Sequence, residues 1–285
     1  MTRKSLFHFA LVGLLWGIPY LLMKVAVEDF PPAAVVAGRT LIGASILIPI
    51  AIYRKKFGGA VLGFKYVAFY ALMEMIGPWI LITTAEQKIN SGLAGLLVST
   101  VPIFATIITS LRGDHTVWQF KRIFGIVVGF VGLILVVGIE SLSGNSDPLS
   151  IAMVIVASMG YAYAVIMVTS NLPLVDGIAI NGLAMAITSV FWAPVAIAQW
   201  PSSISMNSAL SLIALGVFST AIAFILFFKV MAEIGPARSS LVTYLNTAIA
   251  VLLGVIILRE PLTVGIIVGL PLVLVGSYLA SRKTA

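Results

Sequence analysis

The chain has 285 residues, of which 60% are hydrophobic and 9% are charged, and its net charge is +7. A soluble domain carries about 25% charged residues, so this composition excludes an ordinary water-soluble enzyme and a disordered chain. The lysines and arginines are scattered between apolar runs and form no basic stripe of the kind that nucleic acid requires. We therefore expect a membrane protein that is surrounded by the lipid bilayer and has no nucleic-acid partner.

A helix of about 20 apolar residues crosses the hydrocarbon core of a bilayer. The sequence contains ten such stretches, separated by charged or turn-forming residues at 28–32, 54–59, 143–148 and 200–203, among other places. No small-residue cleavage site closes the first stretch, so we interpret it as a retained span and not as a signal peptide. The predicted spans are, in chain order, 6–27, 33–53, 63–84, 90–111, 121–139, 149–170, 176–199, 208–230, 236–258 and 262–281.

The lysines and arginines predict how the spans are oriented, because they gather on the cytoplasmic side of a membrane. With the N-terminus in the cytoplasm, 13 of the 17 fall on the cytoplasmic side and Arg39 lies within the second span. The other three, Lys24, Lys88 and Arg259, fall on the outer side. We therefore expect a multi-pass protein of the cytoplasmic (inner) membrane with both termini in the cytoplasm.

The two halves of the sequence resemble each other. Gly125 and Gly132 in the fifth span recur with the same spacing as Gly269 and Gly276 in the tenth. The predicted repeats are 1–142 and 147–285, with five spans each, and an odd number of spans places the second repeat upside down relative to the first. Inverted repeats are typical of secondary transporters, whose substrate site lies near the middle of the membrane where the repeats meet. The predicted fold is an all-α membrane protein with ten transmembrane helices in two inverted five-helix repeats around a central cavity.

A family resemblance extends over nearly the whole length. The residues that carry it are Trp16 and Gly17 in the first span, Pro32 and Arg39 around the second, and the turn Leu258-Arg259-Glu260-Pro261-Leu262-Thr263 that leads into Gly269 and Gly276. In these features the chain resembles the EamA-type members of the drug/metabolite transporter superfamily. The resemblance implies an exporter of small metabolites, often amino acids, with spans 1–4 and 6–9 around the cavity and spans 5 and 10 to one side. In the first half, Asp114-His115 replaces the Glu-Pro pair of this turn, which leaves the role of Asp114 open.

Arg39 in the second span and Glu74 in the third are charged residues at membrane depth, where a charge is costly unless it is paired or functional. One interpretation is a buried Arg39–Glu74 ion pair that joins the two helices. A second is that Glu74 faces the cavity and takes a proton or meets a substrate ammonium group. A third is that Glu74 is neutral while Arg39 extends toward the outer surface.

Four prolines inside the predicted spans each remove a helical hydrogen bond from the carbonyl four residues earlier. They are Pro19, Pro78, Pro102 and Pro194, and the carbonyl that Pro78 leaves free is that of Glu74. We interpret all four as kinks or hinges. Kinks are common in membrane helices, but free backbone groups are tolerated only beside other protein or a wet cavity, so the Pro78 segment is predicted to line the cavity.

Polar and aromatic residues near mid-span are the candidate substrate-binding residues. A pocket with aromatic walls and a few polar groups would suit amino acids with apolar or aromatic side chains, although such aromatic residues also pack between helices without contacting a substrate. Trp16 and Tyr20 share one helix face by their i, i+4 spacing, as do Met159 and Tyr163. The predicted set is Trp16, Tyr20, Trp79, Ser99, Met159, Tyr163, Tyr244 and Asn246.

Small residues predict close helix approach in spans 5 and 10, where Gly125, Gly129, Gly132, Gly265 and Gly269 lie on one face of their helices. We expect these faces to serve packing within each half or a homodimer contact.

No metal or other cofactor is expected. The sequence has no cysteine, and His8 and His115 are too few to form a zinc site without help from carboxylates. It also has neither a phosphate-binding loop nor a dinucleotide-binding glycine motif. The chain is therefore not expected to be an enzyme or to hydrolyse ATP.

These observations favour a secondary transporter that exports small metabolites by alternating access, with amino acids bearing apolar or aromatic side chains as the favoured substrates. The substrate class and the outward direction rest on the family resemblance. The alternatives are a broad-specificity drug or metabolite exporter, an intramembrane enzyme acting on lipid, and a receptor or scaffold that transports nothing.

Overall fold

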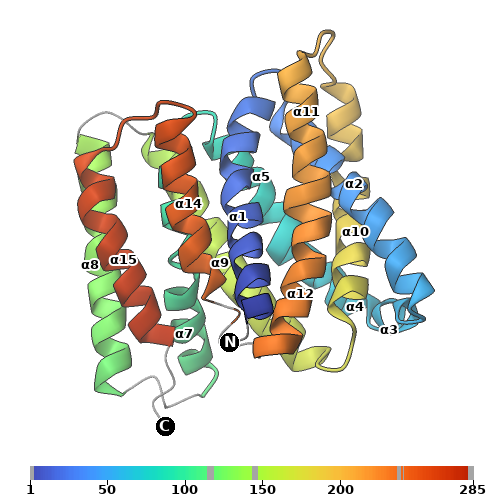
Figure 1. Ribbon diagram of the computed structural model, residues 1–285, viewed down its shortest axis with the longest axis horizontal. Helices are drawn as coiled ribbons and strands as arrows, with labels where there is room; N and C mark the ends of the chain where they lie inside the picture. Colours follow the sequence, from blue (N-terminus) through green and yellow to red (C-terminus); the bar gives the residue numbers. More distant parts are fainter. Residues whose placement is uncertain (1–2, 114–118, 143–146, 236–238, 240, 282–285) are drawn as a thin grey trace.

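The computed structural model describes residues 3–113, 119–142, 147–235, 239 and 241–281. The chain forms a bundle of long helices, several of them interrupted (Figure 1). In chain order the elements are α1 (Arg3–Ala26), α2 (Pro32–Tyr53), α3 (Phe57–Leu62), α4 (Phe64–Ala71), the π-helical η1 (Leu72–Ile76), α5 (Gly77–Ala85), α6 (Ser91–Val98), α7 (Val101–Leu111), α8 (Phe120–Leu142), α9 (Pro148–Asn171), α10 (Gly177–Ala198), α11 (Met206–Ala214), the π-helical η3 (Leu215–Ile222), α12 (Ala223–Ile234), α14 (Val242–Ile256) and α15 (Val264–Ser281).

Each of the ten predicted spans coincides with a helix or a run of consecutive helices in the described part of the chain. Seven of these segments are long and apolar enough to cross a membrane, and α14 and α15 are shorter apolar helices. Helices suit this environment because they satisfy their backbone groups internally where no water is present. The all-helical membrane fold predicted from the sequence is confirmed.

The helices alternate in direction between two ends of the bundle. We call the end at which α1 begins and α15 ends the termini end, and the opposite one the far end (Figure 1). At the far end, Asp147 before α9 lies 3.9 Å from Lys88, in the turn between α5 and α6. Lys24, near the end of α1, contacts that same turn. The first helices of the two halves, α1 and α9, therefore run in opposite directions.

Two of the four predicted proline kinks coincide with breaks in an α-helix. The third span changes from α-helix to π-helix at η1 and resumes as α5, with Pro78 in the first turn of α5. The fourth span is broken between α6 and α7, with Pro102 in the first turn of α7. Pro19 and Pro194 lie inside α1 and α10, which continue past them. The π-helical segment η3 interrupts the eighth span without a proline, so the sequence rule did not find it.

Helices α8 and α15 pack against each other at one side of the bundle (Figure 1), as the resemblance implied for spans 5 and 10. A Cβ atom on Gly276 would overlap the backbone of Gly129, so only glycine allows this approach. Gly132 faces Leu272 and Val273 in the same way. The glycine faces therefore join the two halves, and the expected packing within each half is wrong. They are also buried within the chain, so they cannot form the homodimer contact that was the alternative.

Candidate functional site

A cavity of about 950 Å³ lies between helices of both halves. It reaches the termini end, where Leu172, Pro173 and Val175 of the turn between α9 and α10 line it. At middle depth its wall includes Arg39 and Glu74, and its lining residues also come from α1, α4, α5, α6, α7, α8, α9, α10, η3, α12 and α14. None of the turns at the far end contributes a lining residue among those described.

Buried side chains close the far end. We call the set Ala26, Phe30, Ala34, Ile89 and Leu93 the far-end plug, and each of its members is at most 3% exposed. These residues come from α1, α2, α6 and the turns beside them, and they belong to one continuous apolar cluster. The structure is therefore a conformation whose cavity is accessible from the termini end and sealed at the far end.

Most of the predicted substrate-binding residues line this cavity. The five that do are Trp16, Tyr20, Trp79, Tyr244 and Asn246, and they are joined by the charged residues Arg39 and Glu74 and by the kink residues Pro19 and Pro102. They come from both halves of the sequence, which is the arrangement expected of a site where two repeats meet.

Three predicted residues lie outside the lining. Met159 and Tyr163 are 47% and 37% exposed on the outer face of α9, where the Tyr163 ring contacts Phe69. Tyr161, two residues from each of them, points to the other side of the helix and lines the cavity. Ser99 is fully buried at the break between α6 and α7, where its carbonyl accepts a hydrogen bond from Ser277 Oγ at 2.8 Å. Of the kink residues, Pro78 and Pro194 also lie outside the lining.

Arg39 is buried and joins three helices at the wall of the cavity. Its Nε and Nη2 donate to Thr220 Oγ1 of η3 at 3.3 and 3.1 Å, and Nη1 donates to Met23 Sδ of α1 at 3.6 Å. Its guanidinium carbon lies 3.9 Å from the ring centroid of Trp79, a cation–π arrangement that fixes the plane of the group. The charge is thus held by a hydroxyl, a thioether and an aromatic ring, without a carboxylate among these partners.

Glu74 lies in the π-helical segment η1 and lines the cavity. Its Oε2 is buried and has no hydrogen-bond partner in the described part of the chain. No ion pair joins it to Arg39, so the interpretation of the two residues as a buried ion pair is not supported by the geometry. Arg39 finds its partners on α1, α5 and η3, which removes the need for a pair. Glu74 lines the cavity, and its role toward a proton or a substrate ammonium group stays a prediction.

The π-helical segment is packed closely by α9 and α10. A Cβ atom on Gly160 of α9 would lie 2.8 Å from the carbonyl oxygen of Met73, so a larger residue would push α9 away from Glu74. Trp192 Nε1 of α10 donates to the carbonyl of Ile76, the last residue of η1, at 3.1 Å. Protein neighbours therefore stabilise the break at the depth of Glu74, as such breaks in membranes require.

Sequence reasoning missed several residues of the cavity wall. Tyr70 Oη donates to Asn181 Oδ1 at 3.1 Å, and both residues line the cavity beside Tyr161. On another part of the wall, Phe227 and Phe224 of α12 pack against Trp16 of α1. Their ring centroids lie 4.6 and 5.6 Å, respectively, from that of Trp16. Asn181 had a usable signal, because it is a polar amide in an otherwise apolar span.

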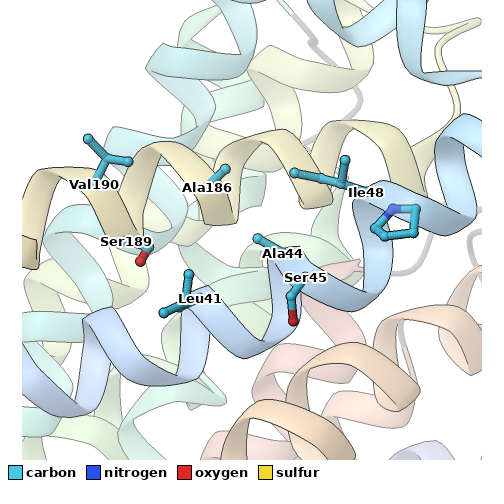
Figure 2. A pocket seen from close by; sticks show the side chains of 8 residues that line it. Leu41, Ala44, Ser45, Ile48, Ala186, Ser189 and Val190 are labelled. Carbon is cyan, nitrogen blue, oxygen red and sulfur yellow. The ribbon is translucent and has the colours of Figure 1, made fainter.

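A second, smaller depression lies on the outside of the bundle between α2 and α10 (Figure 2). Its volume is about 360 Å³, and it is lined by Leu41, Ala44, Ser45, Ile48, Pro49, Ala186, Ser189 and Val190. Ser45 Oγ donates to the carbonyl of Ile42, in its own helix, at 2.8 Å. Leu41 and Val190 are among its most exposed residues. A groove of this composition on a membrane helix faces lipid chains and offers little for binding a polar substrate.

The comparisons with known proteins agree with this geometry. The sequence matches the EamA-like transporter family twice, over residues 3–138 and 148–282. It is 27% identical to the uncharacterized transporter YoaV of Bacillus subtilis over 277 residues, which are 94% of this chain and 93% of that protein. It is also 27% identical to the uncharacterized inner membrane transporter YedA of Escherichia coli K12 over 281 residues, 95% of this chain and 90% of the relative.

The fold is similar to that of a solved crystal structure, with a TM-score of 0.65 and 15% sequence identity. The alignment covers 98% of this chain and 98% of the chain in that structure. A likeness at this identity supports the fold alone. The family matches extend over most of both halves, and the helices they cover surround a cavity whose described lining includes the charged residues Arg39, Glu74 and Arg122. The chain therefore belongs to the EamA-like transporter family of the drug/metabolite transporter superfamily, and it is a multi-pass membrane transporter and not an enzyme.

Proposed function

We propose that the protein exports amino acids with apolar or aromatic side chains from the cytoplasm by alternating access. The observation that carries this proposal is that the Arg39 guanidinium and the Glu74 carboxyl group line the same aromatic-walled cavity and form no ion pair with each other in the described part of the chain. Buried charges usually find partners within the protein. Two that leave each other free complement a zwitterion, which brings one carboxylate and one ammonium group.

Arg39 is the proposed site for the substrate carboxylate. Its Nη1 donates to a thioether sulfur at 3.6 Å, and sulfur is a weak acceptor. A carboxylate that replaced this partner would form a charge-assisted hydrogen bond, which is roughly twice as strong as a neutral one. Trp79 and Thr220 hold the guanidinium in place before the substrate arrives.

Glu74 is the proposed site for the substrate ammonium group. When no substrate is bound, Glu74 binds a proton instead. A carboxyl group that binds one or the other, but not both, exchanges an outgoing substrate for an incoming proton. This role needs a carboxyl that reaches the cavity and has a free oxygen, and Glu74 meets both conditions. The aromatic wall formed by Trp16, Phe224 and Phe227 then faces the substrate side chain.

The direction of transport rests on the predicted orientation. If the N-terminus is cytoplasmic, the termini end faces the cytoplasm and the cavity is open to it. The conformation described above is then the one that collects substrate before export. The relative YedA is named an inner membrane transporter, which supports the same membrane for this chain.

The size of the cavity favours one alternative. Ligand pockets of about 300–1,000 Å³ are usual, and a cavity of about 950 Å³ would also admit larger metabolites or drugs. A broad-specificity exporter would be indifferent to the free carboxylate of its substrates. The two proposals therefore differ in how they treat an amino acid and its methyl ester or amide.

The test is export from proteoliposomes loaded with labelled leucine, phenylalanine or tryptophan, with and without an inward proton gradient. We expect saturable release that the gradient accelerates in the unchanged protein, and release that ignores the gradient in Glu74→Gln. Glu28→Gln, which changes an exposed carboxyl outside the cavity, is the matched control. Equal competition by free amino acids and by their methyl esters would favour broad specificity. Release that ignores the gradient in the unchanged protein would refute coupling through Glu74.

A further inference from the structure

A second buried carboxyl group lies outside the cavity. Glu86 is in the turn between α5 and α6, at the far end, and it is fully buried. Among the residues that the structure describes, neither of its carboxyl oxygens has a hydrogen-bond partner. A buried carboxylate without a partner is strongly disfavoured, so the group must be neutral in this conformation. Burial raises the pKa of Glu86 well above its usual range, and the Glu260 carboxylate adds to this rise, whereas Lys24 and Arg39 oppose it.

The cation nearest in the fold is engaged elsewhere. Lys24 Nζ donates to the backbone carbonyls of Glu86 and Ile89 at 2.6 and 2.8 Å, and so it holds the turn without forming an ion pair with the Glu86 carboxyl. The titratable and charged groups whose fields act on Glu86 and its surroundings are Lys24 and Tyr20 from α1, Arg39 from α2 and Glu260 from the turn before α15.

Hydrogen bonds join the two halves at the far end, where Glu86 lies. The Glu260 carboxylate accepts hydrogen bonds from the backbone N–H of Ser91 at 2.8 Å and from that of Gly92 at 3.3 Å, at the start of α6. Asp29 Oδ2 accepts from the N–H of Ser205 at 2.9 Å, in the segment before α11. Opening the far end must separate some of these contacts, and water would then reach the turn that carries Glu86.

We propose that Glu86 is the proton-binding group of a far-end gate, and that closing the gate requires its carboxylate to take a proton from the medium on that side. When the gate is open, the carboxyl is in water and releases its proton there. When the gate closes, Glu86 is buried at the far end together with its proton. The inference goes beyond the proposed function and rests on that function only for the assumption of alternating access.

The sign of the pH dependence follows from this arrangement. Below the ordinary pKa of a glutamate, 4.5, Glu86 is protonated whether the gate is open or closed, so pH has no effect through it. Between that value and the raised value of the closed state, each rise in pH favours the open gate. One proton per gate gives up to about a tenfold change in the open-to-closed ratio per pH unit.

The sequence has no cysteine, so a single introduced cysteine reports the gate without background. Ala26→Cys lies in the fully buried part of the far-end plug. Ser203→Cys lies on an exposed far-end loop and corrects for thiol chemistry and for orientation in the vesicles. The experiment measures the rate of labelling by a membrane-impermeant maleimide in substrate-free proteoliposomes at external pH 5.5 to 7.5. The quantity compared is the ratio of the labelling rate at Ala26→Cys to the labelling rate at Ser203→Cys.

We expect this ratio to rise at least about tenfold across the range, and to be low and independent of pH after Glu86→Gln. Glu86→Leu, which places an apolar side chain in an apolar site, should also keep the gate closed. Glu28→Gln should retain the rise. A flat ratio in the unchanged protein, or a rise that survives both Glu86 variants, would overturn the proposal. Because no substrate is present, failure of amino-acid export would not affect this result.

Discussion

The two ends of the bundle are held together in different ways. At the far end, the halves are joined by hydrogen bonds of Glu260 and Asp29 to backbone N–H groups at 2.8 to 3.3 Å. At the termini end, an open cavity separates several of the same helices, and the contact between His8 and Glu233 has an N–O distance of 3.4 Å. The far end thus has the geometry of a closed gate, whereas the termini end has the geometry of a cavity opening. The conformational preference of the molecule is therefore expected to be set at the far end.

The largest effect is expected at the cavity, where Arg39→Leu would remove the proposed carboxylate site. A hydrogen bond to a charged group contributes about 1.5–3 kcal/mol, so the apparent affinity for amino acids should fall about tenfold to a hundredfold. Export kinetics in proteoliposomes measure this as a rise in KM. The methyl ester of the same amino acid should lose much less.

Arg39→Lys is the matched variant, because lysine keeps the charge but lacks the planar fork of donors. It should recover part of the affinity. Equal losses for the acid and its ester after Arg39→Leu would contradict a carboxylate site and leave Arg39 as a helix-packing residue.

A smaller effect is expected from Glu260→Ala, which would break the far end and spare the cavity. The variant leaves the N-terminus of α6 without its cap, and losing such a cap costs about 0.5–2 kcal/mol. We expect labelling of Ala26→Cys to increase about twofold to thirtyfold at a fixed pH. Labelling in Glu260→Gln should lie between that of the unchanged Glu260 and that of Glu260→Ala, because an amide oxygen still accepts hydrogen bonds. Unchanged labelling in Glu260→Ala would show that this contact does not hold the gate.

Asp29→Asn would sharpen the comparison through pH. Hydrogen bonds from Ser205 hold the pKa of Asp29 below its ordinary value of 3.8 in the closed state. Ionised Asp29 therefore stabilises the closed far end above that value, and the stabilisation is lost as the pH falls through the lowered value. This dependence is opposite in sign to that of Glu86, and it lies below the range in which Glu86 responds.

Labelling of Ala26→Cys from pH 5.5 to 7.5 should therefore show the same slope with and without Asp29→Asn. The variant should raise the labelling by less than about threefold, as is usual for an exposed polar contact. A changed slope would mean that Asp29, and not Glu86 alone, titrates with the gate.

The spans could be predicted from the sequence because hydropathy is a local property, and five of the eight predicted substrate-binding residues line the cavity. Trp16 and Tyr20 were found because helical spacing places them on one face. Met159 and Tyr163 were chosen by the same spacing, but the helix phase of α9 points Tyr161 to the cavity in their place. Ser99 was chosen as a polar residue near mid-span, but its hydroxyl donates to the carbonyl of Leu96 and its carbonyl accepts from Ser277.

The far-end gate could not be predicted in this way. Glu86 stands at the end of a span beside Gln87 and Lys88, so its sequence surroundings look like an ordinary exposed turn. Its burial depends on residues that are distant in the chain, such as Lys24 and Glu260. Only the packing of the two halves brings these residues together.

The smallest effect is expected at the termini end, from His8→Ala. The contact with Glu233 is partly exposed, with side-chain exposures of 11% and 26%, and such pairs contribute about 0–1 kcal/mol. Labelling of Ala26→Cys and the rate of export should both change by less than about threefold, and Glu233→Gln should behave in the same way. A tenfold shift toward the open far end would mean that His8 and Glu233 respond to the gate across the membrane. The difference between the two ends would then be one of geometry and not of energy.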